Sequence, residues 1–303
     1  MTARRRAVTR VHQDVRMHPV LRPRGVGEIL DAAFAVFRAR FRSVVGLTAV
    51  VVLPVQVLSV LVVLSTQPDD TTPSLTGGVS PVYDSTAPSD LWLQLAGVLV
   101  VALAGLLANS FATAAVTDVV AATYLGDPQP DDVRRSWQHA LRRFPAILGV
   151  GLVSGLAAFA GILVCIAPGV WIYVAWSIAI PALLLERLGV WKSLGRSFAL
   201  VAKRWWTCFA VVLVGALLTI VLQFAFAIPV TYVIDRLGGG VVGDLALGAV
   251  VDTAVAAATT PFLAAMIVVL YFDLRVRFEG LDVQLLVERV STESAPNPSI
   301  AGH

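Results

Sequence analysis

The sequence predicts an all-α integral membrane protein with six transmembrane helices, built as three repeats of an interfacial amphipathic helix followed by a transmembrane hairpin. Its composition is the first indication: 57% of the 303 residues are hydrophobic, 14% are charged and the mean hydropathy is +0.80. Soluble domains carry about 25% charged residues. Six apolar segments and a threefold sequence pattern are the other two indications, and together the three exclude a soluble globular protein.

Six segments are apolar over about 20 residues, the length that crosses the hydrocarbon core of a bilayer. They cover residues 44–65, 91–117, 146–166, 169–185, 207–233 and 245–272. The fourth is the shortest, and a link at Pro168 separates it from the third. Because proline is tolerated in the first turn of a helix, this link suits a tight hairpin.

A 17-residue pattern, which we call an elbow, occurs at residues 25–41, 128–144 and 189–205, each time ahead of a pair of apolar segments. The copies align without a gap and share an aliphatic, an aromatic, a basic and a second aromatic column. In the first copy the apolar side chains fall within a stripe about 60° wide. These are Leu30, Phe34, Phe37 and Phe41. A helix with such a stripe and a charged opposite face is expected to lie in the membrane interface.

The last two columns of the elbows are candidates for contact with membrane lipids, anionic lipids included. They contain Arg40, Arg143 and Arg204, followed by Phe41, Phe144 and Trp205. In one interpretation these residues only anchor each hairpin at the interface. In the other, the three elbows form a ring that recognises lipid headgroups or gates a path between the hairpins. Besides lipids, the partners that we consider are another membrane protein or, in a homo-oligomer, a second copy of this chain.

The distribution of positive charge predicts the orientation. All but one of the 23 lysines and arginines lie before the first apolar segment, between the second and third, between the fourth and fifth, or after the sixth. Loops rich in Lys and Arg stay cytoplasmic, so both termini are expected there. The net charge of +3 then reflects topology, and no nucleic-acid partner is expected. Only two lysines against 21 arginines, with abundant Ala and Val, indicate a GC-rich bacterium and its inner (plasma) membrane.

The chain is expected to divide into three parts: a basic disordered arm at 1–24, a membrane domain at 25–280 and a cytoplasmic tail at 281–303. The predicted repeats within the membrane domain are residues 25–126, 128–188 and 189–280. Residues 66–90 are rich in Ser, Thr and Pro without Lys or Arg, and this composition predicts a disordered outer loop. Whether residues 1–16 are translated stays open.

No catalytic or metal-binding set of residues is visible. The four histidines lie outside the apolar segments, with His139 on the second elbow, and Cys165 and Cys208 are expected at opposite membrane faces. A nucleophilic cysteine needs a nearby base, and neither has one in sequence. We therefore expect no enzyme activity and no cofactor.

Polar residues inside the apolar segments are the default functional candidates in a membrane protein. They are Asn109, Asp118, Gln223 and Asp252. Helix length places Asp118 near the inner interface and Asp252 near the outer one, whereas the amides are expected deeper, as hydrogen-bonding groups between helices. Gly151 and Gly155 form a GxxxG pair that predicts close helix packing, within the chain or between chains.

Acids stand beside bases at the inner ends of the fourth and sixth segments, as candidate helix-end ion pairs. The residues are Glu186, Arg187, Asp273, Arg275 and Arg277. Asp273 and Arg277 are four residues apart on a predicted helix, so they can pair. Surface pairs add only about 0.5 kcal/mol, and we expect these to fix how the helix ends meet.

Three segments resemble the membrane domain of some bacterial glycerophosphoryl diester phosphodiesterases and of stand-alone actinobacterial membrane proteins. They read RPRGVGEILDAAF at 22–34, LLLERLGVWKSLGRSFALV at 183–201 and YFDLRVRFEGLD at 271–282. In fused relatives a soluble barrel performs the hydrolysis, and such a barrel needs at least about 200 residues, whereas 31 follow Phe272. The resemblance thus implies a role near lipids without the catalytic half.

These observations favour a non-catalytic inner-membrane scaffold or accessory subunit in lipid or envelope processes. The alternative is a transporter or channel for a lipid-derived or small amphipathic solute. A lipid-modifying enzyme is disfavoured by the lack of histidines in the apolar segments. A polar cavity reaching Asn109 or Gln223 would favour transport, and a dry core would oppose it.

Overall fold

The computed structural model describes residues 24–66, 88–125, 133–237 and 241–280, and within these ranges it is all-helical. The elements are α2 (Val26–Ala39), α3 (Phe41–Thr66), α4 (Pro88–Leu125), α5 (Val133–Arg142), α6 (Phe144–Val164), α7 (Ile166–Ala175), α8 (Ala179–Leu185), α9 (Val190–Val201), the 3-10 turn η1 (Ala202–Arg204), α10 (Trp205–Leu237) and α11 (Val241–Glu279). The predicted tail and most of the predicted arm and outer loop lie outside the described residues.

Six helical stretches in the described chain are long and apolar enough to cross a membrane, which confirms the predicted number of spans. They are Phe41–Ser65, Gln94–Leu125, Phe144–Val164, Ile166–Leu185, Val190–Val230 and Leu245–Glu279. The fourth stretch is divided: α7 ends at Ala175, and α8 begins at Ala179 after a turn. The turn places Pro181 in the first turn of a new helix, where a missing N–H costs little.

Each elbow contains a helix that stops before the next long helix begins. The long helices α3, α6 and α10 begin at Phe41, Phe144 and Trp205, the second aromatic column. At the start of α2, the carboxylate of Glu28 accepts the N–H of Gly25 at 3.0 Å, which satisfies one of the free donors of the first turn. The sequence pattern thus marks the places where the chain changes direction.

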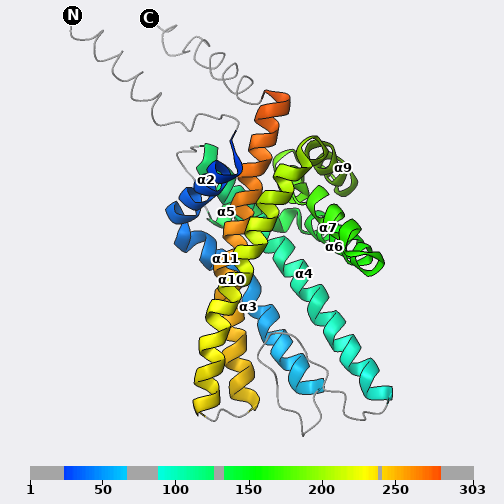
Figure 1. The fold of residues 1–303 in the computed structure, drawn as a ribbon, viewed down its shortest axis with the longest axis vertical. Helices are drawn as coiled ribbons and strands as arrows, with labels where there is room; N and C mark the ends of the chain where they lie inside the picture. Colours follow the sequence, from blue (N-terminus) through cyan, green and yellow to red (C-terminus); the bar gives the residue numbers. More distant parts are fainter. Residues whose placement is uncertain (1–23, 67–87, 126–132, 238–240, 281–303) are drawn as a thin grey trace, which may run out of the picture.

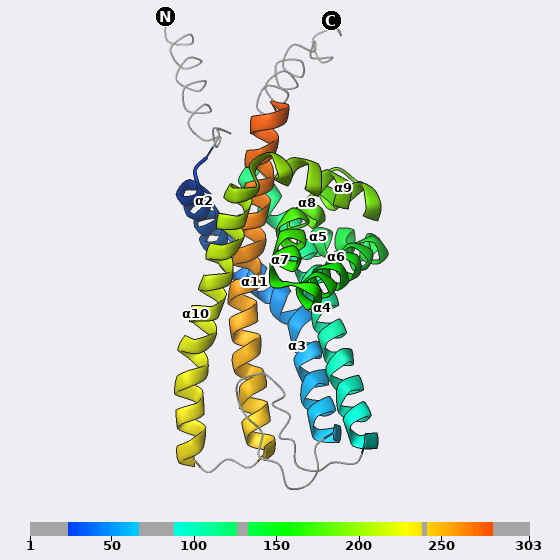
Figure 2. The same ribbon diagram turned by 45° about the vertical axis from the view of Figure 1, so that its right-hand side comes forward.

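Helix α11 is the central element of the bundle. It runs the length of the molecule beside α10, and α3 and α4 form a second long pair (Figure 1). Each spanning stretch contains an 18-residue apolar window, and the window of α11 has the largest fraction of buried residues, 72%. In both ribbon views the α6–α7 hairpin lies beside the upper half of the long helices (Figures 1 and 2). Most of the close packing therefore lies in this half.

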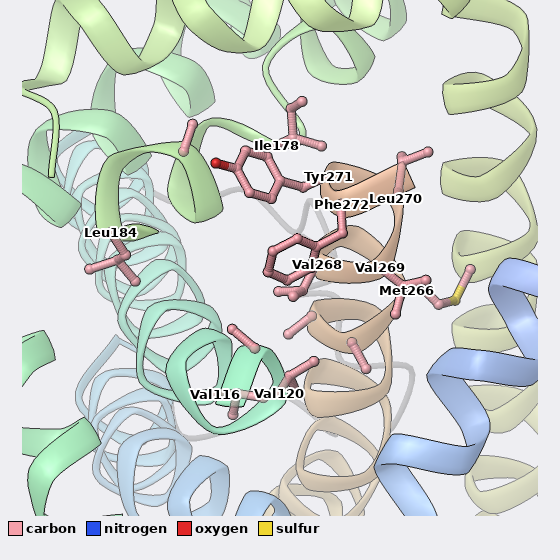
Figure 3. Close-up of a cluster of buried hydrophobic side chains, with 14 of the residues drawn as sticks. Val116, Val120, Ile178, Leu184, Met266, Val268, Val269, Leu270, Tyr271 and Phe272 are labelled. Carbon is pink, nitrogen blue, oxygen red and sulfur yellow. The ribbon is translucent and has the colours of Figure 1, made fainter. Parts of the chain in front are cut away.

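The core in the upper half joins α4, α8 and α11. Tyr271 is fully buried, and Figure 3 shows it with its neighbour Phe272 between side chains of α4 and α8. The ring of Phe272 stacks on Tyr124 of α4, with centroids 5.4 Å apart. Burying such aromatic rings is a large apolar contribution, and it fixes the end of α11 against α4.

Glycines allow α6 to approach its neighbours closely. A Cβ at Gly155 would lie 2.6 Å from Leu106 of α4, and one at Gly151 would clash with Ser110 of the same helix. The GxxxG pair thus packs within the chain, which decides between the two alternatives for these residues. Gly161 faces Gly169 of α7, where an added Cβ would lie 2.8 Å from the Gly169 Cα. Backbone contact of this kind holds the α6–α7 hairpin together.

Candidate functional site

Most of the interhelical charge contacts lie where α2 begins, α8 passes into α9 and α11 ends. We call this region the charged end. Its ion pairs connect helices that are far apart in the sequence, and several of the carboxylates are largely shielded from solvent. It is the only region in the described residues where more than two ionised side chains form one connected group, and it is therefore the candidate site.

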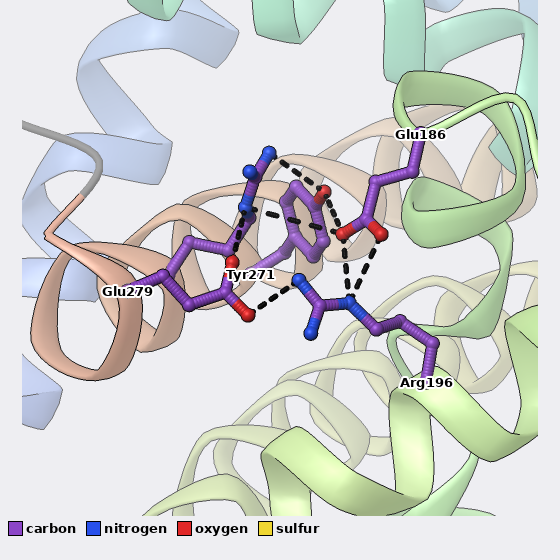
Figure 4. Close-up of polar contacts among 5 residues, drawn as sticks. Glu186, Arg196, Tyr271 and Glu279 are labelled. Atoms are coloured by element: carbon purple, nitrogen blue, oxygen red, sulfur yellow. Dashed lines mark hydrogen bonds and ion pairs between the residues drawn. The ribbon is translucent and has the colours of Figure 1, made fainter. Parts of the chain in front are cut away.

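Two carboxylates and two guanidinium groups form the first group, which we call the four-charge network (Figure 4). Arg196 of α9 donates through Nε to both oxygens of Glu186, at 3.0 and 2.9 Å, and its Nη2 lies 2.5 Å from Glu279 Oε1. Arg275 Nε lies 3.0 Å from Glu279 Oε2 and 3.9 Å from Glu186 Oε1. Charges of both signs alternate around the group, so it is electrically balanced.

The hydroxyl of Tyr271 lies inside the same network. It donates to Glu186 Oε1 at 2.8 Å and accepts from Arg275 Nη1 at 3.3 Å. A buried tyrosine hydroxyl requires a partner, and here it has one of each kind. The network thereby continues from the charged surface into the apolar core of α11.

The backbone at the end of α8 places Glu186 in the network. Arg187 adopts the left-handed conformation, with φ of 53°, and the N–H of Leu188 donates to the carbonyl of Leu183 at 3.1 Å. This is the bond of a Schellman motif, which usually has glycine at the left-handed position. The chain therefore reverses sharply after Glu186, and α9 returns across the end of α11. The side chain of Arg187 is exposed.

The second group binds the backbone that leads into α2. Asp273, with a side chain only 1% exposed, accepts the N–H of Arg24 at 2.6 Å and Arg277 Nε at 2.8 Å. Arg277 Nη2 donates to the carbonyl of Arg24 at 2.7 Å. The pairing of Asp273 with Arg277 is the one that their spacing predicts. Together the two side chains bind the backbone N–H and C=O of Arg24. These two contacts therefore do not depend on the side chain at position 24.

The three arginines of the basic column do not have equivalent surroundings. Arg143 donates to the carbonyl of Leu188 at 3.3 Å, so it connects the second elbow to the start of the third. Arg40 also has an interaction within the protein, whereas Arg204 has no ion pair in the described chain. Two of their aromatic neighbours pack within their own repeats, Phe41 against Phe37 and Trp205 against Phe209, whereas Phe144 packs against Phe111 of α4 in the first repeat.

The polar candidates inside the spans divide into two pairs and one exposed amide. Gln223 of α10 donates to Asp252 of α11 at 2.8 Å. Asp118 Oδ2 lies 2.6 Å from His139 Nδ1, which attaches α5 to α4. Asn109 is exposed on α4 and bonds to no other described residue, in contrast to the expectation of an interhelical bond.

Three buried threonine hydroxyls are satisfied within their own helices. Thr48, Thr117 and Thr259 each donate to the carbonyl four residues earlier, at 2.7–2.9 Å. Groups paired in this way have no free donor to offer a passing solute. The buried Ser197 hydroxyl of α9 differs, because it donates to the carbonyl of Ala175 in α7 at 2.8 Å.

Sequence reasoning did not include Arg196, Glu279, Tyr271 or the His139–Asp118 contact among the candidates. Tyr271, Arg275 and Glu279 follow each other at intervals of four, and this spacing was an available signal for a shared helix face. For Arg196, by contrast, no local pattern predicts that its side chain bonds to carboxylates at the ends of two other helices, α8 and α11.

The described residues contain no cluster of three or more His, Cys, Asp or Glu side chains that could hold a metal ion. Comparison with known proteins found no matching family model, no similar curated protein and no similar solved structure. The six apolar helices define the class: a multi-pass helical membrane protein.

Proposed function

We propose that this chain is a non-catalytic scaffold or accessory subunit of a bacterial inner membrane, acting in lipid or envelope processes with both termini in the cytoplasm. The observation that supports the proposal is that the acids of the charged end are occupied in bonds between helices. Glu186, Asp273 and Glu279 are each bonded to arginine and hold helices together. Acids committed in this way are poor candidates for acid–base catalysis, which needs a group that can reach its substrate.

The proposal includes three repeats of elbow and hairpin. Supporting it, the helix of each elbow ends just before the second aromatic column, where the next long helix begins. The first elbow also has the surfaces of an interfacial helix: one buried against the bundle, one apolar and exposed, and one charged and exposed. These sets are Ile29, Ala33 and Val36; Phe34 and Phe41; and Glu28, Asp31 and Arg38. Such a helix suits a boundary of protein, acyl chains and water.

A uniform lipid-binding ring of Arg40, Arg143 and Arg204 receives less support than anchoring. Arg143 is engaged with the Leu188 carbonyl, and Arg40 has a partner within the protein. Neutralising all three arginines would test the ring: if the lipids that copurify remain the same, the ring hypothesis is lost. We therefore assign the elbows an anchoring role, with any selective lipid contact outside this column.

Topology is tested with alkaline phosphatase fused after Gly280 or inserted within residues 66–90. Phosphatase is active only outside the cytoplasm, so the first fusion should be inactive and the second active. The opposite pattern would overturn the orientation. The scaffold role is tested by purifying the full chain in native lipid particles and identifying bound proteins by mass spectrometry, with recovery of no specific partner counting against it.

A transporter remains the second candidate because Asp252 and Gln223 place a carboxylate–amide pair between two spanning helices. Intramembrane carboxylates often mark ion or proton pathways. Reconstituted vesicles would show uptake of a small amphipathic solute that Asp252→Asn abolishes and that Gln56→Leu, at an amide of the spanning helix α3, retains. The locally paired hydroxyls favour the scaffold instead.

A further inference from the structure

The two lysines of the protein lie on the third elbow, at Lys192 in α9 and Lys203 in η1. Both side chains are exposed, and in the described chain neither forms an ion pair. Lys203 Nζ lies 4.7 Å above the ring of Phe278, which positions the ammonium without neutralising it. The lysines are eleven positions apart, so their side chains project from the helix in directions that differ by only about 60°.

The neighbouring carboxylates do not neutralise these lysines. Glu186 and Glu279 are bonded to Arg196 and Arg275, and Asp273 is bonded to Arg277. The internal groups therefore balance, and among the residues that the structure describes no carboxylate pairs with the lysines of the third elbow. Arg204, directly after Lys203, adds to the positive charge of this elbow.

The face of α9 next to the lysines is apolar. Trp191 and Phe198 are 76% and 42% exposed, and with Ala202 they lie within about 40° around the helix. The opposite side of α9 is buried against the bundle at Leu194, Leu200 and neighbouring residues. In Figure 2, α9 crosses the top of the bundle instead of following the long helices. Its free surface combines exposed aromatic rings with ammonium groups.

The first elbow has a different charge at the equivalent positions. Lys192 aligns with Glu28, and Gly195 aligns with Asp31, so the exposed face of α2 is acidic where that of α9 is basic or neutral. At these two positions, elbows with the same anchoring design thus differ in charge, although α2 also carries the exposed Arg38. Anchoring alone does not call for a lysine at position 192, whereas binding of an anion by this elbow would use one.

We infer that the exposed face of the third elbow is a binding surface for anionic phospholipid, with Lys192 and Lys203 at the headgroup phosphates and Trp191 and Phe198 among the acyl chains. The inference rests on the proposed inner-membrane orientation, because it needs this elbow at a lipid headgroup layer. Lysine is a hydrated point charge that suits headgroup phosphates. Basic residues near an anionic surface each add about 1 kcal/mol of binding, or about fivefold in affinity.

The test titrates the full chain in neutral detergent with phosphatidylglycerol or phosphatidylcholine and counts bound lipids by native mass spectrometry. The double variant K192Q/K203Q should bind phosphatidylglycerol about 25-fold more weakly, from two fivefold steps. K192R/K203R, which keeps both charges, should stay within about threefold of wild type. The matched control R38Q/R42Q removes two exposed charges, one from α2 in the first elbow and one from the start of α3, and should change binding less than twofold.

Equal losses in K192Q/K203Q and R38Q/R42Q would overturn the inference, because binding would then follow total charge. No loss in K192Q/K203Q would also overturn it. Amine-reactive labelling is a second readout: phosphatidylglycerol but not phosphatidylcholine should protect both lysines. Circular dichroism melting of each variant checks the fold, and K192R/K203R keeps the test valid if the glutamine variant unfolds. The phosphatase fusions report orientation separately, so failure of lipid selectivity with the expected topology rejects only this inference.

Discussion

Replacing Asp273 by Ala should destabilise the protein more than any other loss of an acid at the charged end. Its side chain is 1% exposed and accepts the Arg24 N–H at 2.6 Å and Arg277 Nε at 2.8 Å. Removing one partner of a buried ion pair costs about 3–5 kcal/mol. Because the Arg277 side chain is 23% exposed and can recover some hydration, we expect about 3 kcal/mol, the lower end of this range.

The assay is unfolding of the full chain by sodium dodecyl sulfate in mixed micelles, followed by circular dichroism. Asp31→Ala removes an exposed acid of α2 and is the matched control, with an expected change within about 0.5 kcal/mol. Asp273→Asn should lie between the two. Its amide oxygen can still accept from the Arg24 N–H, but its amide nitrogen presents donors to a guanidinium that has only donors.

A double-mutant cycle separates the ion pair from the backbone contact. Asp273→Ala combined with Arg277→Ala should cost clearly less than the sum of the single changes, because the double variant leaves no unpaired buried charge. Additive effects would show that the two side chains act independently. A loss below about 0.5 kcal/mol for Asp273→Ala would refute the reasoning that this carboxylate holds the start of α2.

Three further changes have defined outcomes in the same unfolding assay. Arg187→Gly should stabilise the protein by about 1 kcal/mol, because φ of 53° strains a residue with a Cβ. Arg187→Ala keeps the Cβ and should not stabilise the protein, so equal effects of the two changes would contradict this reasoning. Gly161→Ala should cost more than about 2 kcal/mol of stability, since its Cβ would lie 2.8 Å from the Gly169 backbone. Gly46→Ala is the control, because a Cβ at Gly46 faces open space. Similar losses of stability for both would contradict the close contact. Arg196→Lys should cost about 1–2 kcal/mol because one ammonium cannot replace a guanidinium shared by two carboxylates, and a neutral result would show that shape is unimportant there.

The spans could be predicted from sequence because their signal is local. A membrane-crossing helix needs a run of apolar residues, and each predicted segment overlaps a helical stretch that is long and apolar enough to cross, with ends that differ by at most three residues where the segment extends beyond the stretch. The change of direction before Phe41, Phe144 and Trp205 is also local, since one aromatic follows one arginine in each copy. These features depend on few contacts outside their own segments.

The partners of the charged side chains could not be predicted in the same way. Glu186 stands next to Arg187 in sequence, but the left-handed turn directs the chain so that Arg196 bonds to Glu186 instead. The contact of Asp118 with His139 likewise depends on how α5 lies on α4. Such pairings follow from helix crossings, and composition and periodicity contain little information about crossings.

The exposure of Asn109 shows a second limit. Amides inside spans usually bond between helices, which was the reason to expect a partner. Whether a side chain faces a neighbour depends on the rotation of its helix, and α4 turns Ser110 toward α6 and leaves Asn109 outside. A shift of one residue along a helix rotates the side chain by about 100°, so a correct span assignment does not determine the face.

Three arginines and the two lysines near the charged end differ in their surroundings, while Arg187 and Arg204 have no ion pair among the described residues. Arg196, Arg275 and Arg277 each bond to a carboxylate within the protein, where a planar guanidinium can serve several acceptors at once. Lys192 and Lys203 lie outside, exposed and without ion pairs in the described chain. The three guanidinium groups join the helices, and the two ammonium groups, together with Arg204, remain available to a hydrated anionic surface.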